Sequence, residues 1–175
     1  EFVRGTGAHL FDRDGNDWLD AYNNVPSVGH AHPRVAEAIA RQAATLNTHT
    51  RYLDAATIDY AEQLIQTFDG ALGDDVHVMF TCTGSEANDL ALRIAKAATG
   101  GTGVLVTEHA YHGVTTEIAA ISPSLGGLES IAPWVRVIPA PGRGVDFAAG
   151  VRDGLASLAA GGIRPAALIV DTVFA

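Results

Sequence analysis

The sequence holds one lysine and one cysteine, Lys96 and Cys82, among its 175 residues. A single cysteine excludes an internal disulfide framework and fits a reducing compartment, so we expect a cytoplasmic location. There is no run of five or more basic residues, and the formal net charge is −9, which argues against a nucleic-acid partner or an anionic membrane. No apolar run approaches the roughly 20 residues that a membrane helix needs.

What the sequence does contain is typical of a folded domain. Hydrophobic residues make up 47% and charged residues 18%, enough to build a core. The first residues, Glu-Phe-Val-Arg, do not resemble a signal peptide. The sequence begins without methionine and stops just after a predicted strand, and we expect it to be a fragment of a longer chain.

The N-terminal part predicts a small α+β segment, to which we assign residues 1–53. Residues 8–12 and 16–20 read as a hairpin around Asp14-Gly15. A helix is expected from Pro33, with its apolar face at Val35, Ile39, Ala43 and Leu46. A second helix is expected after an N-cap at Asp54, with a buried stripe of Ile58, Ala61, Leu64, Ile65 and Phe68.

From Val76 onward the pattern alternates between short apolar strands and helices. The expected strands are 76–80, 103–107, 134–138 and 166–170, and the expected helices are 85–98, 114–121 and 147–159. Strands that alternate with helices pair in parallel and are covered on both faces. The sequence therefore predicts a three-layer α/β fold with a mostly parallel sheet.

Residues 83–86, Thr-Gly-Ser-Glu, have the spacing of a capping box at a helix start. The Thr83 hydroxyl then accepts from the Glu86 amide, which leaves the amides of Gly84 and Ser85 free at the positive end of the helix dipole. Gly84 presents no side chain to an approaching anion. Ligands of open α/β sheets bind beyond the carboxyl ends of strands, so we call Thr83, Gly84 and Ser85 the candidate phosphate cradle. The alternative is a helix that is simply well capped; the sequence fits neither a Walker A loop nor Gly-x-Gly-x-x-Gly.

Tyr111, His112 and Gly113 follow the next predicted strand, and we call them the aromatic loop. An aromatic ring at this sheet edge can stack on a flat heterocycle, with His112 beside it. The alternative is an ordinary packed loop aromatic. His30 and His32 have no further clustered ligand, so we expect no metal site there.

Together these motifs resemble the class III aminotransferases, which are fold type I enzymes that use pyridoxal 5′-phosphate. The motifs that carry the resemblance are 14–15, 18–20, 29–33, 84–88 and 111–113. Residues 23–25, 46–53 and 85–93 look most like the branch of alanine–glyoxylate aminotransferase 2-like proteins and of phospho-lyases acting on ethanolamine phosphate or phosphohydroxylysine. The resemblance implies that residues 54–175 are the first part of the cofactor-binding large domain.

The resemblance also implies roles for single residues. Thr83, Gly84 and Ser85 hold the cofactor phosphate, Tyr111 stacks on the pyridine ring, and His112 lies close by. Asp171 falls where many relatives carry a glutamate near the ring or substrate. Asn24 and Arg51 are candidates for substrate binding, and the alternative for Arg51 is a surface ion pair.

Two groups that the family needs are expected downstream of Ala175: the aspartate that pairs with the pyridine nitrogen and the Schiff-base lysine. We therefore assign no catalytic residue to this chain. Lys96 is predicted on the solvated face of its helix and cannot substitute.

The resemblance implies transfer of an amino group from an amine or amino acid to a keto acid by the intact protein, which is expected to be a homodimer. The alternatives are a phospho-lyase, a non-catalytic phosphate-binding α/β module and an inert interaction fragment.

Overall fold

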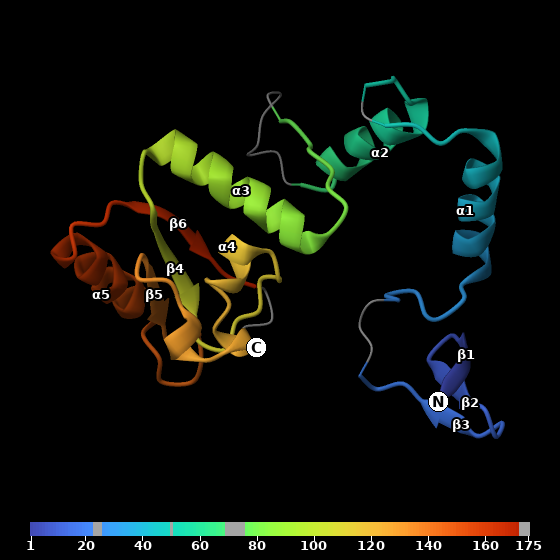
Figure 1. Ribbon diagram of the computed structural model, residues 1–175, viewed down its shortest axis with the longest axis horizontal. Helices are drawn as coiled ribbons and strands as arrows, with labels where there is room; N and C mark the ends of the chain where they lie inside the picture. The colour runs from blue at the N-terminus through green and yellow to red at the C-terminus, as the bar shows by residue number, and fades with distance from the viewer. Residues whose placement is uncertain (23–25, 50, 69–75, 172–175) are drawn as a thin grey trace. The chain divides into compact units, whose positions relative to one another are not determined.

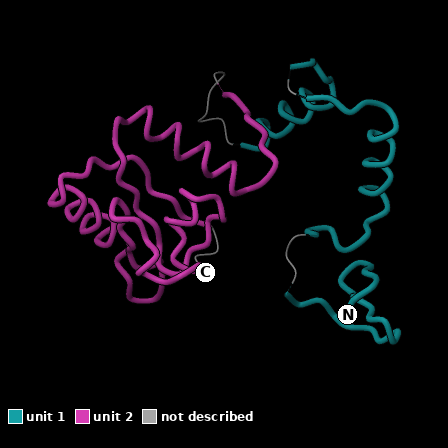
Figure 2. Tube along the Cα trace, viewed as in Figure 1, with its two compact units in different colours: residues 1–72 teal, residues 73–175 magenta. Residues whose placement is uncertain are grey.

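The computed structural model describes residues 1–22, 26–49, 51–68 and 76–171. The chain divides into two compact units, Glu1–Leu72 and Gly73–Ala175 (Figure 2). The assignment of residues 1–53 and 54–175 to two functional segments stays a prediction.

Unit 1 opens with an antiparallel sheet of β1 (Phe2–Thr6), β2 (His9–Asp12) and β3 (Asp17–Leu19) in that order. The expected hairpin is confirmed, and β1 is an additional strand. The hairpin turn depends on Gly15, whose φ of 85° is open to glycine at little cost. The Asp12 carboxylate accepts from the Asp14 and Asn16 amides, the Asn16 side chain and the Trp18 indole.

The helices of unit 1 are α1 (Pro33–Thr45) and α2 (Ala55–Ile65). Pro33 starts α1 and Asp54 occupies the N-cap position of α2, as expected. The prediction of a buried stripe on α2 is wrong. No residue of α2 is buried, and Ile58 and Phe68 are 45% and 57% exposed. The 3.6-residue period identifies an apolar face, but burial also needs a second element packed against that face.

Unit 2 contains a parallel sheet with the order β5-β4-β6 among the described residues (Figure 1). Its strands are β4 (Gly103–Thr107), β5 (Val135–Ile138) and β6 (Pro165–Ile169). Its helices are α3 (Gly84–Thr99), α4 (Thr116–Ala119) and α5 (Phe147–Ala160), with the 3-10 turns η2 (Pro123–Leu125) and η3 (Leu128–Ser130). Parallel pairing on both sides of β4 confirms the predicted sheet type.

The two faces of β4 bury different residues, which produces three layers. Val104 and Val106 pack with Leu92 of α3 on one face. Leu105 packs with Leu158 of α5 on the other face. All five residues of β4 are buried, as expected for a strand covered on both faces.

One expected strand is missing from unit 2. Residues 76–80 form neither helix nor strand, and Met79 and Phe80 are 64% and 44% exposed. An apolar run becomes a strand only beside a hydrogen-bonding neighbour, and no described strand pairs with this one. The short helix expected over 114–121 is limited to four residues. Within the described ranges, no helix is long and apolar enough to cross a membrane.

Candidate functional site

The N-terminus of α3 forms the predicted capping box. The Thr83 hydroxyl accepts from the Glu86 amide at 3.1 Å, and the Glu86 carboxylate accepts from the Thr83 amide at 3.1 Å. The same carboxylate accepts from the Cys82 amide at 2.9 Å. The capping box provides acceptors for the amides of Thr83 and Glu86. It leaves the proton of the Thr83 hydroxyl available as a donor.

The amides of Gly84 and Ser85 have no acceptor among the described residues. A methyl group built on Gly84 would meet no atom within 4 Å, so the space beside the Gly84 Cα is open. Two unused amides at a helix N-terminus, beside open space, are an arrangement that binds anions.

The aromatic loop lies after β4, as expected, and its two rings differ in burial. Tyr111 is 56% exposed, whereas His112 is only 6% exposed. The exposed phenol ring is thus available for a flat ligand. The His112 amide donates to the hydroxyl of the fully buried Ser122 at 3.0 Å.

Two hydrogen bonds and one close approach of the backbone bring the aromatic loop and the start of α3 together. The Asn88 side chain donates to the His112 carbonyl at 2.7 Å, and the Val114 amide donates to Ser85 Oγ at 3.0 Å. Gly113 has a φ of 136°, and a Cβ there would lie 2.5 Å from Ser85 Oγ. Glycine is therefore required at position 113 by backbone conformation and by close approach.

His112 is kept neutral by its surroundings. Burial lowers the pKa of its imidazole below the ordinary value of 6.5, and the negative charge of Asp171 opposes this effect. Asp171, half-buried after β6, is therefore close enough to act on His112 electrostatically. Within the described part of the chain, His112 Nε2 is buried without a hydrogen-bond partner. A buried, unpaired ring nitrogen is unfavourable unless a ligand completes its hydrogen bonds.

The two candidate substrate residues belong to unit 1. Asn24 lies outside the described residues. Arg51 is exposed, and its guanidinium pairs with no carboxylate among the residues described, so the surface ion pair considered above is not formed there. Substrate binding by Arg51 stays a prediction.

The prediction that Lys96 is solvated is wrong. Its ammonium group is hydrogen-bonded and ion-paired to Glu117 and lies 4.1 Å from the centre of the Trp134 ring, and its side chain is only 21% exposed. At 1.5 Å per residue, Lys96 is about 18 Å along α3 from Gly84. Lys96 is thus a structural cation at the other end of the helix that carries the cradle.

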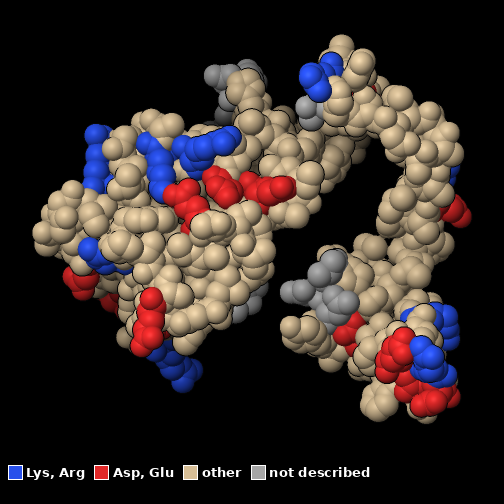
Figure 3. All heavy atoms as spheres, viewed as in Figure 1, with Lys and Arg blue, Asp and Glu red and all other residues tan. Residues whose placement is uncertain are grey.

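Charged side chains elsewhere are interspersed. Figure 3 shows acidic and basic groups beside one another on the viewed face of each unit, and the Arg13–Glu1 and Arg41–Glu37 pairs are examples in unit 1.

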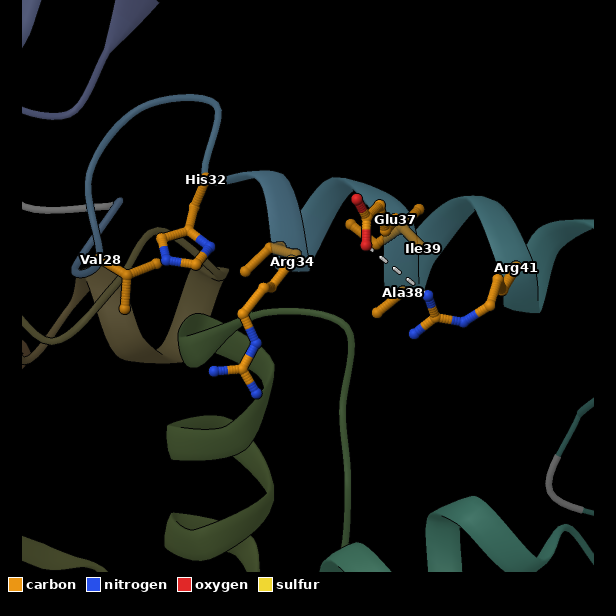
Figure 4. Close-up of a pocket in the computed structure, with 8 residues that line it drawn as sticks. Val28, His32, Arg34, Glu37, Ala38, Ile39 and Arg41 are labelled. Carbon is orange, nitrogen blue, oxygen red and sulfur yellow. Dashed lines mark ion pairs between the residues drawn. The ribbon is translucent and has the colours of Figure 1, made fainter.

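A shallow depression along α1 is lined by Val28 and His32 together with helix residues, including paired Glu37 and Arg41 (Figure 4). No described group of three histidine, cysteine or acidic side chains could hold a metal ion.

The residues at the α3 N-terminus fit the phosphate and ring of pyridoxal 5′-phosphate. The open, donor-lined space at Gly84 suits a phosphate, and the exposed Tyr111 ring and unpaired His112 nitrogen suit a flat heterocycle. A parallel three-layer sheet with such a site beyond its strands defines an α/β ligand-binding domain.

The chain belongs to the class III aminotransferases, because the family model described as "Aminotransferase class-III" matches residues 1–141. It is 42% identical over 141 residues to ethanolamine-phosphate phospho-lyase homolog 1 of Caenorhabditis elegans, covering 79% of this chain and 29% of that protein. It is 39% identical over 145 residues to the alanine–glyoxylate aminotransferase 2-like protein of Drosophila melanogaster, covering 81% and 28%. The chain thus spans less than a third of the length of each.

Solved structures agree with this assignment. A phospholyase from Arthrobacter in complex with phosphoethanolamine matches all of this chain and 43% of its own, with 43% identity and a TM-score of 0.89. Taurine:2-oxoglutarate aminotransferase from Bifidobacterium kashiwanohense, in complex with pyridoxal 5′-phosphate (PLP) and glutamate, matches with a TM-score of 0.72 at 23% identity, covering 97% of this chain and 42% of its own. The second match supports the fold alone. The predicted fold class is confirmed, and the chain is an incomplete part of that fold.

Sequence reasoning misses the residues that join the two halves of the site. Asn88 stands out only as part of a motif, and its bond to His112 spans 24 positions. Ser122 stands in no pattern at all. A serine directly after a buried isoleucine gives no indication that its hydroxyl accepts from a distant loop.

Proposed function

We propose that the full-length protein binds pyridoxal 5′-phosphate at the N-terminus of α3 and is an aminotransferase, moving the amino group of an amine or amino acid to a keto acid. The observation that carries the proposal is the pair of unused amides at Gly84 and Ser85, with open space beside the Gly84 Cα. The bound cofactor supplies an electron sink for bond cleavage at the substrate Cα. Everything else at this site is binding and orientation.

The chain's own residues divide this work. The amides of Gly84 and Ser85 and the hydroxyls of Thr83 and Ser85 donate to the phosphate. Tyr111 packs against the ring. His112 stays uncharged because burial lowers its pKa, so its unpaired Nε2 can serve as a hydrogen-bond partner. Asp171 places a negative charge near that imidazole.

The 175-residue chain alone is expected to be inactive. Its one lysine is held by Glu117 and Trp134 at the far end of α3. The reactive lysine and the aspartate that pairs with the pyridine nitrogen are expected in the remainder of the protein, as is the rest of the large domain that begins at residue 54.

A second candidate is a phospho-lyase that releases phosphate from ethanolamine phosphate or phosphohydroxylysine. The identities of 42% and 43% to proteins with phospho-lyase names favour it. Arg51, exposed and without a carboxylate partner among the described residues, offers a group for a substrate phosphate, provided that it reaches the site in the assembled enzyme.

One assay of the full-length protein with PLP separates the candidates. An aminotransferase consumes a keto acid in proportion to the amino donor and releases no phosphate. A phospho-lyase releases inorganic phosphate from ethanolamine phosphate without any keto acid. A protein that binds the cofactor and does neither would contradict both.

We propose a homodimer in the cytoplasm for the full-length protein. The dimer is supported by the family assignment, and light scattering of the purified protein tests it. The cytoplasmic location is supported by the single cysteine. Cell fractionation tests that part of the proposal.

A further inference from the structure

The position of the aromatic loop depends on side chains rather than on backbone pairing. Residues 111–113 belong to neither a helix nor a strand. Both polar groups of the His112 backbone are satisfied by side chains. The amide donates to Ser122 Oγ at 3.0 Å, and the carbonyl accepts from Asn88 Nδ2 at 2.7 Å. Buried backbone groups of this kind need such partners, so these two side chains determine where the loop lies.

Asn88 belongs to the same helix as the cradle. It follows Ser85 by three positions, which places both residues on neighbouring turns of one helix face. Ser85 itself touches the loop, because its hydroxyl accepts from the Val114 amide at 3.0 Å. The spacing between cradle and loop is thus set by two contacts from one turn of α3.

We propose that Asn88 is a positioning residue that fixes the distance between the phosphate cradle and the Tyr111 ring. This inference rests on the proposed function, in which the cradle holds the phosphate and Tyr111 contacts the ring. Asn88 acts through the His112 carbonyl and not on the ligand. By fixing this distance, Asn88 allows a ligand that carries both a phosphate and a ring to contact the cradle and Tyr111 at the same time.

Loss of Asn88 should affect ligands that contact both the cradle and Tyr111, and not ligands that contact the cradle alone. Two contacts to one rigid ligand reinforce each other only while the protein groups keep the matching separation. Loss of Asn88 frees the His112 carbonyl and loosens the loop. The Gly84 and Ser85 amides remain fixed by the capping box, so phosphate binding alone persists.

The test uses the full-length protein stripped of cofactor and three probes in calorimetric titrations. Inorganic phosphate reports on the cradle, 4′-deoxypyridoxine reports on the ring contact, and 4′-deoxypyridoxine 5′-phosphate reports on both. None of them has an aldehyde, so none reacts with an amine.

Asn88→Ala is expected to leave the Kd for phosphate within about twofold and to weaken the combined probe by about three- to tenfold, the usual effect of one hydrogen bond. Ser122→Ala removes the acceptor of the His112 amide, the other anchored group of the same residue's backbone, and is expected to act alike, which keeps the test available if one variant fails to fold. Tyr111→Ala should add little in the Asn88→Ala background, because both changes remove the same ring contact.

Thr99→Ala is the matched control. Thr99 also donates from α3 to a main-chain carbonyl, that of Ala95, at 2.8 Å, but about 16 Å further along the helix than Asn88. It should leave all three affinities unchanged.

Two results would overturn the inference alone: equal loss of phosphate and combined-probe binding in Asn88→Ala, or no loss of either. If the unmodified protein binds neither phosphate nor the combined probe, the proposed function itself fails, and the inference with it.

Discussion

The ammonium group of Lys96 lies 4.1 Å from the centre of the Trp134 ring while it pairs with the Glu117 carboxylate. These two contacts join α3 to α4 and to the loop before β5 on the same face of the sheet. A lysine held in this way is directed into protein contacts. Its amine is thereby removed from the reactions that a free lysine undergoes.

We predict that Lys96 does not form an adduct with pyridoxal 5′-phosphate. Treating the full-length protein with the cofactor and then with borohydride should leave the Lys96 peptide unmodified in mass spectra. A modified lysine elsewhere in the same digest serves as the positive control. Stoichiometric modification at Lys96 would contradict its contacts with Glu117 and Trp134.

Replacing Gly84 separates the phosphate cradle from a merely well-capped helix. An alanine methyl at position 84 meets no protein atom within 4 Å, and alanine favours a helix over glycine. Gly84→Ala should therefore keep or raise the free energy of unfolding, by up to about 1 kcal/mol. Phosphate binding should weaken by about ten- to a hundredfold, because the methyl displaces a charged hydrogen-bond acceptor. Unchanged phosphate affinity would favour the capped-helix alternative.

Local patterns carry most of what can be predicted from the sequence. The capping box spans positions 83–86, so both of its partners stand side by side in the sequence. The strand at 103–107 is recognisable because Val104, Leu105 and Val106 form a short apolar run with no polar alternation. In both cases the physical cause of the structure lies within a few residues.

Features that depend on distant partners could not be predicted. Helical periodicity places Lys96 opposite the apolar face, but its partner Glu117 is 21 positions away. The same limit explains α2. Its apolar residues do recur at helical spacing, but no described element packs against them and buries them. Residues 76–80 are a third case, since a strand exists only through its neighbour.

His112 should make the stability of the cofactor-free protein pH-dependent. Its folded-state pKa lies below 6.5 because of burial. Below the unfolded-state pKa, the unfolded chain therefore binds the extra proton while the folded one does not, so stability falls as the pH drops through about 6.5. Denaturant titrations between about pH 8 and pH 5 should show this loss, and it should shrink in His112→Gln. An identical pH dependence in both proteins would contradict the neutral, buried imidazole.

Asp12 should stabilise the hairpin of unit 1 only in its ionised form. Hydrogen bonds from the Asn16 and Trp18 side chains lower its pKa from 3.8 to about 2. The folded-state pKa is depressed, so the stabilisation is complete above 3.8 and is lost as the pH falls through about 2. A carbon-13 NMR titration of the Asp12 carboxylate should give a midpoint near the lower value. Asn16→Ala should move that midpoint upward, and a midpoint already near 3.8 in the unmodified protein would exclude these bonds in solution.

Two glycines with positive φ allow the contact between the cradle and the aromatic loop to be measured. Gly127 has a φ of 69° and a ψ of −170°, a region that is essentially reserved for glycine, and a methyl group at this position would meet nothing within 4 Å, so Gly127→Ala carries only the backbone cost, about 1–3 kcal/mol. At Gly113, with φ 136°, the methyl would also lie 2.5 Å from Ser85 Oγ.

Gly113→Ala should therefore lower the free energy of unfolding more than Gly127→Ala does, as measured in urea. It should also weaken phosphate binding, because Ser85 has to move and the Val114 amide loses its acceptor. Gly127→Ala should bind phosphate like the unmodified protein. If the two variants are equally destabilised and bind phosphate equally well, the aromatic loop does not pack against Ser85. The phosphate cradle and the aromatic loop would then be independent of each other.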